Sequence, residues 1–207
     1  MPSSSSSLKA GHRLSGLVLG VFIALHLGNH VLALHSIAWH QWGMTRLRLV
    51  YRQPVVETLL LAAVLWQIGS GLLLVCRGWP PATPFFERVQ GYSGLYLALF
   101  LLIHVGAVLV GRYVWHVETD FYFAARGLNT APWYWFFGPY YLLAVGAIFG
   151  HLAAAHYRNR RNRDRAPMEA LLILVSGFVL GLLLVLGFTN YFRGIPVPVA
   201  LVKAVHW

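Results

Sequence analysis

The sequence of 207 residues predicts an all-α protein, an integral membrane bundle of five transmembrane helices that forms one domain over residues 1–207. The first observation behind this prediction is composition: 58% of the residues are hydrophobic and only 11% are charged, whereas a soluble domain carries about 25% charged residues. The second is five apolar segments, each long enough to cross roughly 30 Å of hydrocarbon, which takes about 20 helical residues. The third is a pair of histidines deep inside two of these segments. The single cysteine, Cys76, excludes an internal disulfide and any cysteine-ligated zinc or iron–sulfur centre.

In chain order, the transmembrane helices are expected at residues 14–36, 54–76, 91–112, 134–156 and 168–190. The serine-rich residues 1–10 are expected to be flexible and are too unlike a signal peptide to be cleaved. Trp79-Pro80-Pro81 ends the second segment, and Thr130-Ala131-Pro132-Trp133 leads into the fourth. Trp and Tyr near these ends are typical of aromatic belts at a membrane interface.

The basic residues predict which side of the membrane each connection faces. The chain has sixteen Lys and Arg but only six Asp and Glu. No nucleic-acid-binding motif occurs among the basic residues, so we expect them to set the orientation of the helices in the membrane and to contact lipid headgroups. Nine basic residues fall on the side of the N-terminus, with five of them in one short stretch, residues 158–165. Seven fall on the other side: Arg46, Arg48, Arg52, Arg112, Arg126, Arg193 and Lys203. The sequence therefore predicts a multi-pass protein of the inner (cytoplasmic) membrane with a cytoplasmic N-terminus. The stretch at 158–165 is read as an anchor on lipid, with docking of a cytoplasmic partner as the alternative.

A repeat connects the first and third segments. Ser15-Gly16 is followed ten residues after the glycine by His26, and Ser93-Gly94 is followed at the same spacing by His104. Both histidines lie roughly 18–20 Å from the cytoplasmic end of their helix at 1.5 Å rise per residue. Ionisable residues inside a membrane are costly and mark functional sites. Two imidazoles at equal depth suit the axial positions of one haem iron, and an interhelical hydrogen bond is the alternative for each.

Other polar residues in the segments extend this hypothesis. His30 follows His26 by one helical turn, His151 lies in the fourth segment, and Gln67 is at a comparable place in the second, which contains no histidine. Gly16, Gly20, Ala24 and Gly28 form a small-residue stripe, which indicates either close helix packing or room for a flat macrocycle. The loop after the third segment contains His116, Glu118 and Asp120. We expect this loop to be solvated and not to form a metal site.

These residues resemble the membrane anchor of succinate dehydrogenase/fumarate reductase, of the single-chain, five-helix cytochrome b type. The resemblance rests on His26-Leu-Gly-Asn29-His30 preceded by Ser-Gly, on the later Ser93-Gly94 with His104, and on His151. Helix number and order extend it over nearly the whole chain. It implies a subunit that anchors a flavoprotein and an iron–sulfur subunit on the cytoplasmic side and exchanges electrons with membrane quinone.

The resemblance also implies roles for individual residues. His26 and His104 match the axial pair of the haem b far from the soluble subunits, and Gln67 and His151 match the pair of the near haem. The His12-Arg13-x-Ser15-Gly16 piece is similar to one that borders the quinone site in related two-chain anchors. Gln67 departs from the family's histidine, so the near haem is absent, bound by His151 alone, or liganded from elsewhere. Quinone in the vacated space could accept a hydrogen bond from the Gln67 amide.

The residues themselves leave further roles and functions open. Arg13 and Arg112 could pair with haem propionates, and His12 and His30 could carry protons, since imidazole titrates near neutral pH. A haem-free membrane scaffold or small transporter is the main alternative, although the parallel repeat of two segments is unlike the inverted repeats of transporters. The other alternative is a cytochrome b anchor of a different oxidoreductase.

Overall fold

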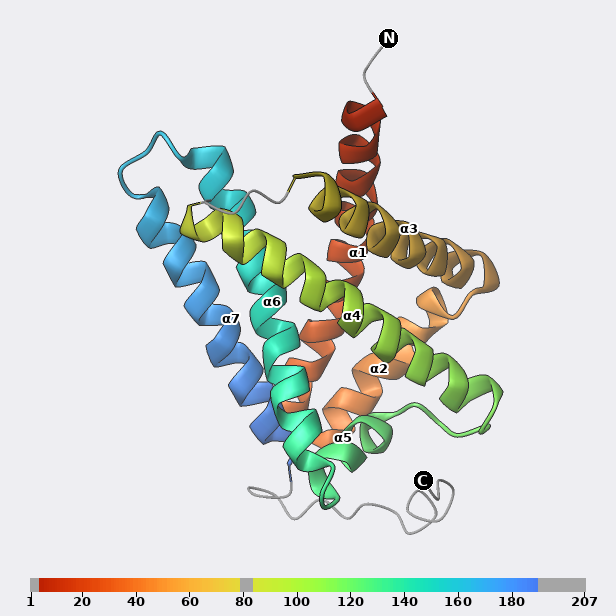
Figure 1. Cartoon of the computed structure of the whole chain (residues 1–207). Helices are drawn as coiled ribbons and strands as arrows, with labels where there is room; N and C mark the ends of the chain where they lie inside the picture. Colours follow the sequence, from red (N-terminus) through yellow and green to blue (C-terminus); the bar gives the residue numbers. More distant parts are fainter. Residues whose placement is uncertain (1–3, 79–83, 190–207) are drawn as a thin grey trace.

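The computed structural model describes residues 4–78 and 84–189, and this part of the chain folds into seven α-helices (Figure 1). Their bounds are α1 (Ser4–His35), α2 (Ile37–Tyr51), α3 (Pro54–Gly78), α4 (Phe85–Tyr113), α5 (Phe121–Asn129), α6 (Tyr134–Arg160) and α7 (Ala166–Phe188).

Five of these helices are long and apolar enough to span a membrane, which confirms the predicted number and order. The spans are Ser6–His35, Pro54–Arg77, Phe85–Tyr113, Tyr134–Arg160 and Ala166–Phe188. Many large apolar side chains are exposed on the outer surfaces of these helices; for example, Leu17 is 71% exposed and Val55 is 72% exposed. An apolar exterior of this extent is typical of helices in contact with lipid. The chain is therefore a multi-pass membrane protein with an all-α fold.

Residues 1–10 are expected from the sequence to be flexible, whereas the described part of this segment is helical in the structure. The helix α1 begins at Ser4, and residues 1–3 lie outside the described residues. Tertiary contact accounts for the difference, because a Cβ atom built on Gly11 would lie 3.0 Å from the ring of Trp66 in α3. At Gly11, therefore, α1 packs closely on α3, a contact that composition does not reveal.

Two short helices were not expected from hydropathy. After α1 ends, Ser36 starts α2 by accepting a hydrogen bond from the Trp39 backbone N–H at 3.1 Å. Asp120 starts α5 in the same way, accepting from the backbone N–H groups of Tyr122 and Phe123 at 2.9 and 3.3 Å. Asp120 is thus the N-cap of α5.

The helix α5 closes one end of the bundle. Its buried face, formed by Phe121, Ala125 and Leu128, packs against Ala33 of α1 and Phe188 of α7. These residues form one of two apolar cores; the other joins α4, α6 and α7 through Phe86, Ala153, Ala154 and Ala170.

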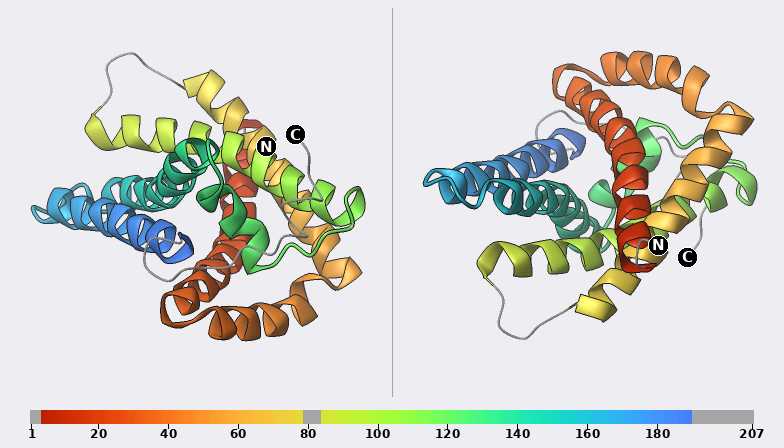
Figure 2. Two further views of the ribbon diagram at one scale, coloured as in Figure 1. Left: turned by 90° about the horizontal axis from the view of Figure 1, so that it is seen from below. Right: turned by 90° about the horizontal axis from the view of Figure 1, so that it is seen from above.

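The long helices pack in a chain of pairs. The helix α1 lies against α2 and α3, α4 lies against α6, and α6 lies along the whole of α7 (Figures 1 and 2). The last pair approaches closely because Gly146 of α6 receives the ring of Phe178, and Gly177 of α7 receives that of Phe149. Pro139 lies inside α6 near its start, and the helix continues through it.

Candidate functional site

The repeated Ser-Gly-x9-His pattern places its serine and histidine on one face of each helix. Eleven residues are close to three turns of about 3.6 residues, so the two side chains are stacked roughly 16 Å apart along the helix. In the structure Ser15 and Ser93 are buried, and both helices turn these serines into the bundle. The repeat therefore builds two polar layers, one at the serines and one at the histidines.

In the first copy, the serine layer joins α1 to α3 through Gln67. The Ser15 hydroxyl donates to Oε1 of Gln67 at 2.5 Å, and Nε2 of Gln67 donates to Nε2 of His12 at 3.2 Å. His12 then places its Nδ1 2.8 Å from the Ser70 hydroxyl. Since Gln67 donates to Nε2, the His12 proton lies on Nδ1 and is donated to Ser70. Both ring nitrogens of His12 are thus committed to α3.

In the second copy, the serine layer joins α4 to α6 through His151. The Ser93 hydroxyl lies 3.3 Å from Nδ1 of His151. A Cβ atom on Gly94 would lie 3.6 Å from Cε1 of His151, just as one on Gly16 would lie 3.4 Å from Nε2 of Gln67. Gln67 and His151 therefore occupy equivalent positions against the two Ser-Gly pairs, which agrees with their pairing in the sequence.

The deeper layer brings the imidazole rings of His26 of α1 and His104 of α4 together in an edge-on arrangement. Their ring centroids are 6.2 Å apart and their planes are inclined by 67°. Within the described residues, α1 and α4 do not pack directly against each other, so the two imidazoles meet across a space between helix backbones. Phe22 stacks on His26 at 5.7 Å, and Phe100 stacks on His104 at 5.0 Å.

His26 also begins a row of hydrogen-bonded imidazoles. Its Nε2 lies 3.1 Å from Nε2 of His30, and Nδ1 of His30 lies 3.1 Å from Nε2 of His40 in α2. His40 is 2% exposed, and its Nδ1 has no hydrogen-bond partner among the described residues. Burial, followed by the nearby His26 and the Arg48 charge, lowers the pKa of His40 to about 4. His40 is therefore neutral at physiological pH.

His104 differs from the other histidines in this layer. Among the described residues it makes no hydrogen bond, and its neighbours are the rings of Phe100 and His26. An interhelical hydrogen bond is the common reason for a histidine inside a membrane protein, and here that reason is missing. The unpaired imidazole is free to bind a ligand.

The structure does not bring every predicted residue to this site. Arg13 is exposed and lies about 160° around α1 from Ser15, so it faces away from both layers. The outer part of the small-residue stripe also faces away, since Gly20 and Gly28 have nothing within 4 Å of a hypothetical Cβ atom. Only Gly16 packs at the site, so for Gly20 and Gly28 neither close packing nor a macrocycle on the His26 face is seen.

The described residues contain no group of three or more His, Cys, Asp or Glu placed to hold a metal ion. His26 and His104 form a pair, and His151 belongs to the serine layer about three turns away. Two imidazoles are what an axial haem pair needs, whereas a structural zinc needs four ligands.

Sequence reasoning missed His40, because it lies outside every span in a segment with Arg46 and Arg48. The one local signal is its spacing of four residues after Ser36, the residue that caps α2. A helix that starts after Ser36 and runs back along α1 places His40 beside the end of α1.

Comparison of the chain with protein-family models, with curated proteins and with solved structures finds no match.

Proposed function

We propose that this protein is a haem-b-binding membrane subunit that passes electrons between a soluble partner and membrane quinone. The observation that carries the proposal is the pair formed by His26 and His104, whose ring centroids lie 6.2 Å apart although, in the described part of the chain, α1 and α4 are not packed backbone against backbone. The sequence resemblance to succinate dehydrogenase/fumarate reductase anchors suggests the partners: a flavoprotein and an iron–sulfur subunit.

The separation of the two rings supports the assignment of an axial pair. A metal-to-imidazole bond is about 2.0–2.1 Å long, and a ring centroid lies about 1.1 Å beyond the bound nitrogen. The rings of His26 and His104, with centroids 6.2 Å apart, would therefore be near enough to hold one iron between them. His104 would do so without giving up a hydrogen bond, whereas Nε2 of His26 lies within hydrogen-bond distance of His30.

Haem b, when bound, supplies reversible one-electron transfer. The chain would supply two imidazole ligands and an apolar wall. The rings of Phe22 and Phe100, stacked on the two histidines, form part of that wall. A low-polarity environment is one of the means by which a protein sets a haem potential.

The serine layer is the place we assign to quinone. Gln67, His12 and Ser70 form a connected set of hydrogen-bonding groups there, and the second N–H of the Gln67 amide can donate to a quinone carbonyl. We propose a single haem per chain, since Gln67 stands opposite Ser15 in the position that His151 has opposite Ser93. An amide oxygen is a weak ligand for haem iron beside imidazole.

We further propose that the protein lies in the cytoplasmic membrane with this layer nearer the cytoplasm. The connection from α6 to α7, which carries the basic stretch at 158–165, lies at the same end of the bundle as the start of α1 (Figure 1). Positive residues in short connections favour the cytoplasmic side. Of the basic residues counted on the opposite side, Arg193 and Lys203 lie outside the described residues.

The experiment is a haem assay on the purified full chain from haem-replete cells. We expect one haem per chain by pyridine haemochrome and an alpha band near that of b haems after dithionite reduction. His104→Ala should lose the haem, because this substitution removes a ligand without breaking a hydrogen bond. His35→Ala is the matched control, since His35 is an exposed histidine in α1.

A colourless wild-type protein, or one in which His104→Ala and His35→Ala retain equal haem, would overturn the proposal. The first result would favour the haem-free scaffold or transporter, in which hydrogen bonds such as those of His12 and His30 serve helix packing. Co-purification with a flavin-containing partner separates a dehydrogenase anchor from a cytochrome b anchor of another oxidoreductase.

A further inference from the structure

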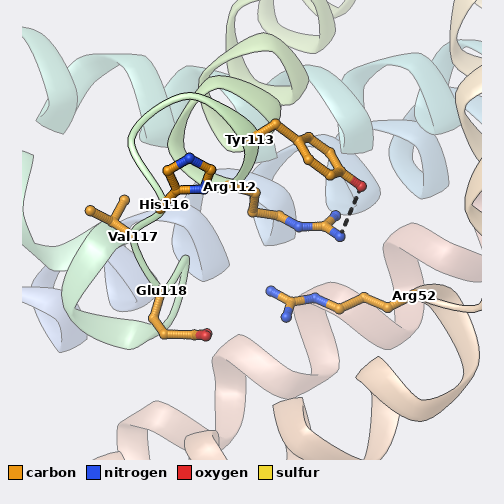
Figure 3. A pocket seen from close by; sticks show the side chains of 6 residues that line it. All are labelled: Arg52, Arg112, Tyr113, His116, Val117 and Glu118. Atoms are coloured by element: carbon orange, nitrogen blue, oxygen red, sulfur yellow. Dashed lines mark hydrogen bonds between the residues drawn. The ribbon is translucent and has the colours of Figure 1, made fainter.

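A polar cavity lies at the end of the bundle opposite the N-terminus of α1. It has a volume of about 320 Å³ and is bounded by the α2–α3 connection, the end of α4 and the loop that follows (Figure 3). Its lining residues are Arg52, Arg112, Tyr113, His116, Val117 and Glu118. This volume falls at the lower end of the range for small-ligand sites, about 300–1,000 Å³.

The charges around the cavity do not cancel. Arg112 forms a two-point ion pair with Glu57 of α3, and Arg48 lies 3.3 Å from a carboxylate oxygen of Glu118. Arg52 is left with a neutral partner, the Thr119 hydroxyl at 3.2 Å, and has no carboxylate partner among the described residues. Three guanidinium groups therefore share two carboxylates, so that one positive charge remains.

The unpaired charge is partly buried. The Nε atoms of Arg48 and Arg52 are enclosed and have no hydrogen-bond partner among the described residues. Burial, and next the charges of Arg48 and Arg112, lower the pKa of Arg52. Enclosed donors without a protein partner are rare, and a water molecule or a bound ion commonly satisfies them. Figure 3 shows the guanidinium groups of Arg52 and Arg112 turned toward the same space.

The loop that forms one wall of the cavity has a strained backbone. His116 has a φ of 52°, in the left-handed region that few residues other than glycine adopt. The loop is fastened behind it, where the Val117 backbone N–H donates to the Gly111 carbonyl at 2.9 Å. Strained backbone of this kind concentrates at ligand-binding sites.

We infer that this cavity binds one oxyanion group, a phosphate or a carboxylate, through Arg52 with help from Arg112. Guanidinium groups match the planar and tetrahedral oxygens of such anions with paired hydrogen bonds. The group can come from a soluble small molecule or from the headgroup of an anionic lipid, and both present the same chemistry to Arg52. This inference does not depend on haem or quinone.

The test uses the purified full chain in an uncharged maltoside detergent. Inorganic phosphate is titrated at constant ionic strength against chloride, and binding is followed by calorimetry and by the thermal midpoint. In a second arm, the chain is placed in nanodiscs of phosphatidylcholine with or without phosphatidylglycerol, and retained lipid is counted by native mass spectrometry.

We expect saturable binding in at least one arm, and R52Q should weaken it by roughly tenfold or more through the loss of a charged, bidentate donor. R46Q is the matched control and should leave binding unchanged, since Arg46 is an exposed arginine of α2 that lies over the Trp42 ring. Binding to phosphate would assign a soluble ligand, whereas binding only to phosphatidylglycerol would assign a lipid headgroup.

A second variant keeps the test decisive if R52Q fails to fold. E118Q removes one of the two carboxylates from the cavity and should tighten anion binding severalfold, because it increases the net positive charge. Unchanged or weaker binding in E118Q would overturn the inference. So would equal effects of R52Q and R46Q, or no saturable binding in either arm.

Discussion

Nε2 of His30 lies 3.1 Å from Nε2 of His26, one turn earlier on α1. To hold haem iron, Nε2 of His26 would have to give up this contact with His30. His30 would therefore compete with haem iron for Nε2 of His26 and would not assist binding. Substitution of each histidine can distinguish the two roles.

His30→Ala is expected to retain a full complement of haem, because it frees Nε2 of His26 without removing a ligand. His26→Ala is expected to lose it. The measurement is haem per chain by pyridine haemochrome for both variants, purified in parallel. The opposite pattern, with haem lost in His30→Ala and kept in His26→Ala, would move the ligand to His30.

Gly177→Ala is expected to destabilise the protein by about 1–3 kcal/mol, the usual cost of overpacking a filled interface. A Cβ atom at this position would overlap Cβ of Phe149, so α6 and α7 would have to separate. Thermal unfolding in detergent provides the measurement. Gly28→Ala is the control, since nothing lies within 4 Å of its hypothetical Cβ atom, and equal losses in both variants would refute the close packing.

Glu57→Ala is expected to cost about 3 kcal/mol, because it leaves Arg112 without its carboxylate in a position where both side chains are 19% exposed. The pair joins α3 to α4. A double-mutant cycle with Arg112→Ala should give a coupling of about 1 kcal/mol or more. Additive losses in the double variant would show that the ion pair contributes nothing.

Acidification is expected to destabilise the α1–α2 packing through His40. Its folded-state pKa is lowered to about 4 from an ordinary value of 6.5. Above pH 6.5 the folded and unfolded chains both hold His40 neutral, and its contribution to stability is complete. As the pH falls from 6.5 to about 4 the unfolded chain takes up the proton first, so stability decreases across this window.

His40→Gln should reduce that pH dependence, because glutamine does not titrate. The measurement is the thermal midpoint of wild type and variant between pH 7.5 and 4. Parallel curves for the two proteins would show that His40 does not cause the loss.

Much of the membrane architecture could be predicted from the sequence. Length and apolarity alone determine five spans, because only a helix of about 20 apolar residues satisfies its backbone inside a bilayer. The spacing of Ser15 to His26 and of Ser93 to His104 likewise determines that each pair shares a helix face. The structure agrees, with the two serines buried and the rings of the two histidines brought together.

Other features were decided only by tertiary structure. The stripe containing Gly20 and Gly28 has the small residues of a packing face, yet no side chain packs on these two glycines. Hydropathy could not predict this, because lipid and a neighbouring helix are equally apolar. His40 and Arg52 gain their significance from residues far along the chain, Arg52 from Arg112 and Thr119. Local pattern determined which residues lie on one face of a helix. Only the packing of the helices decided which faces meet, because that depends on contacts between residues distant in sequence.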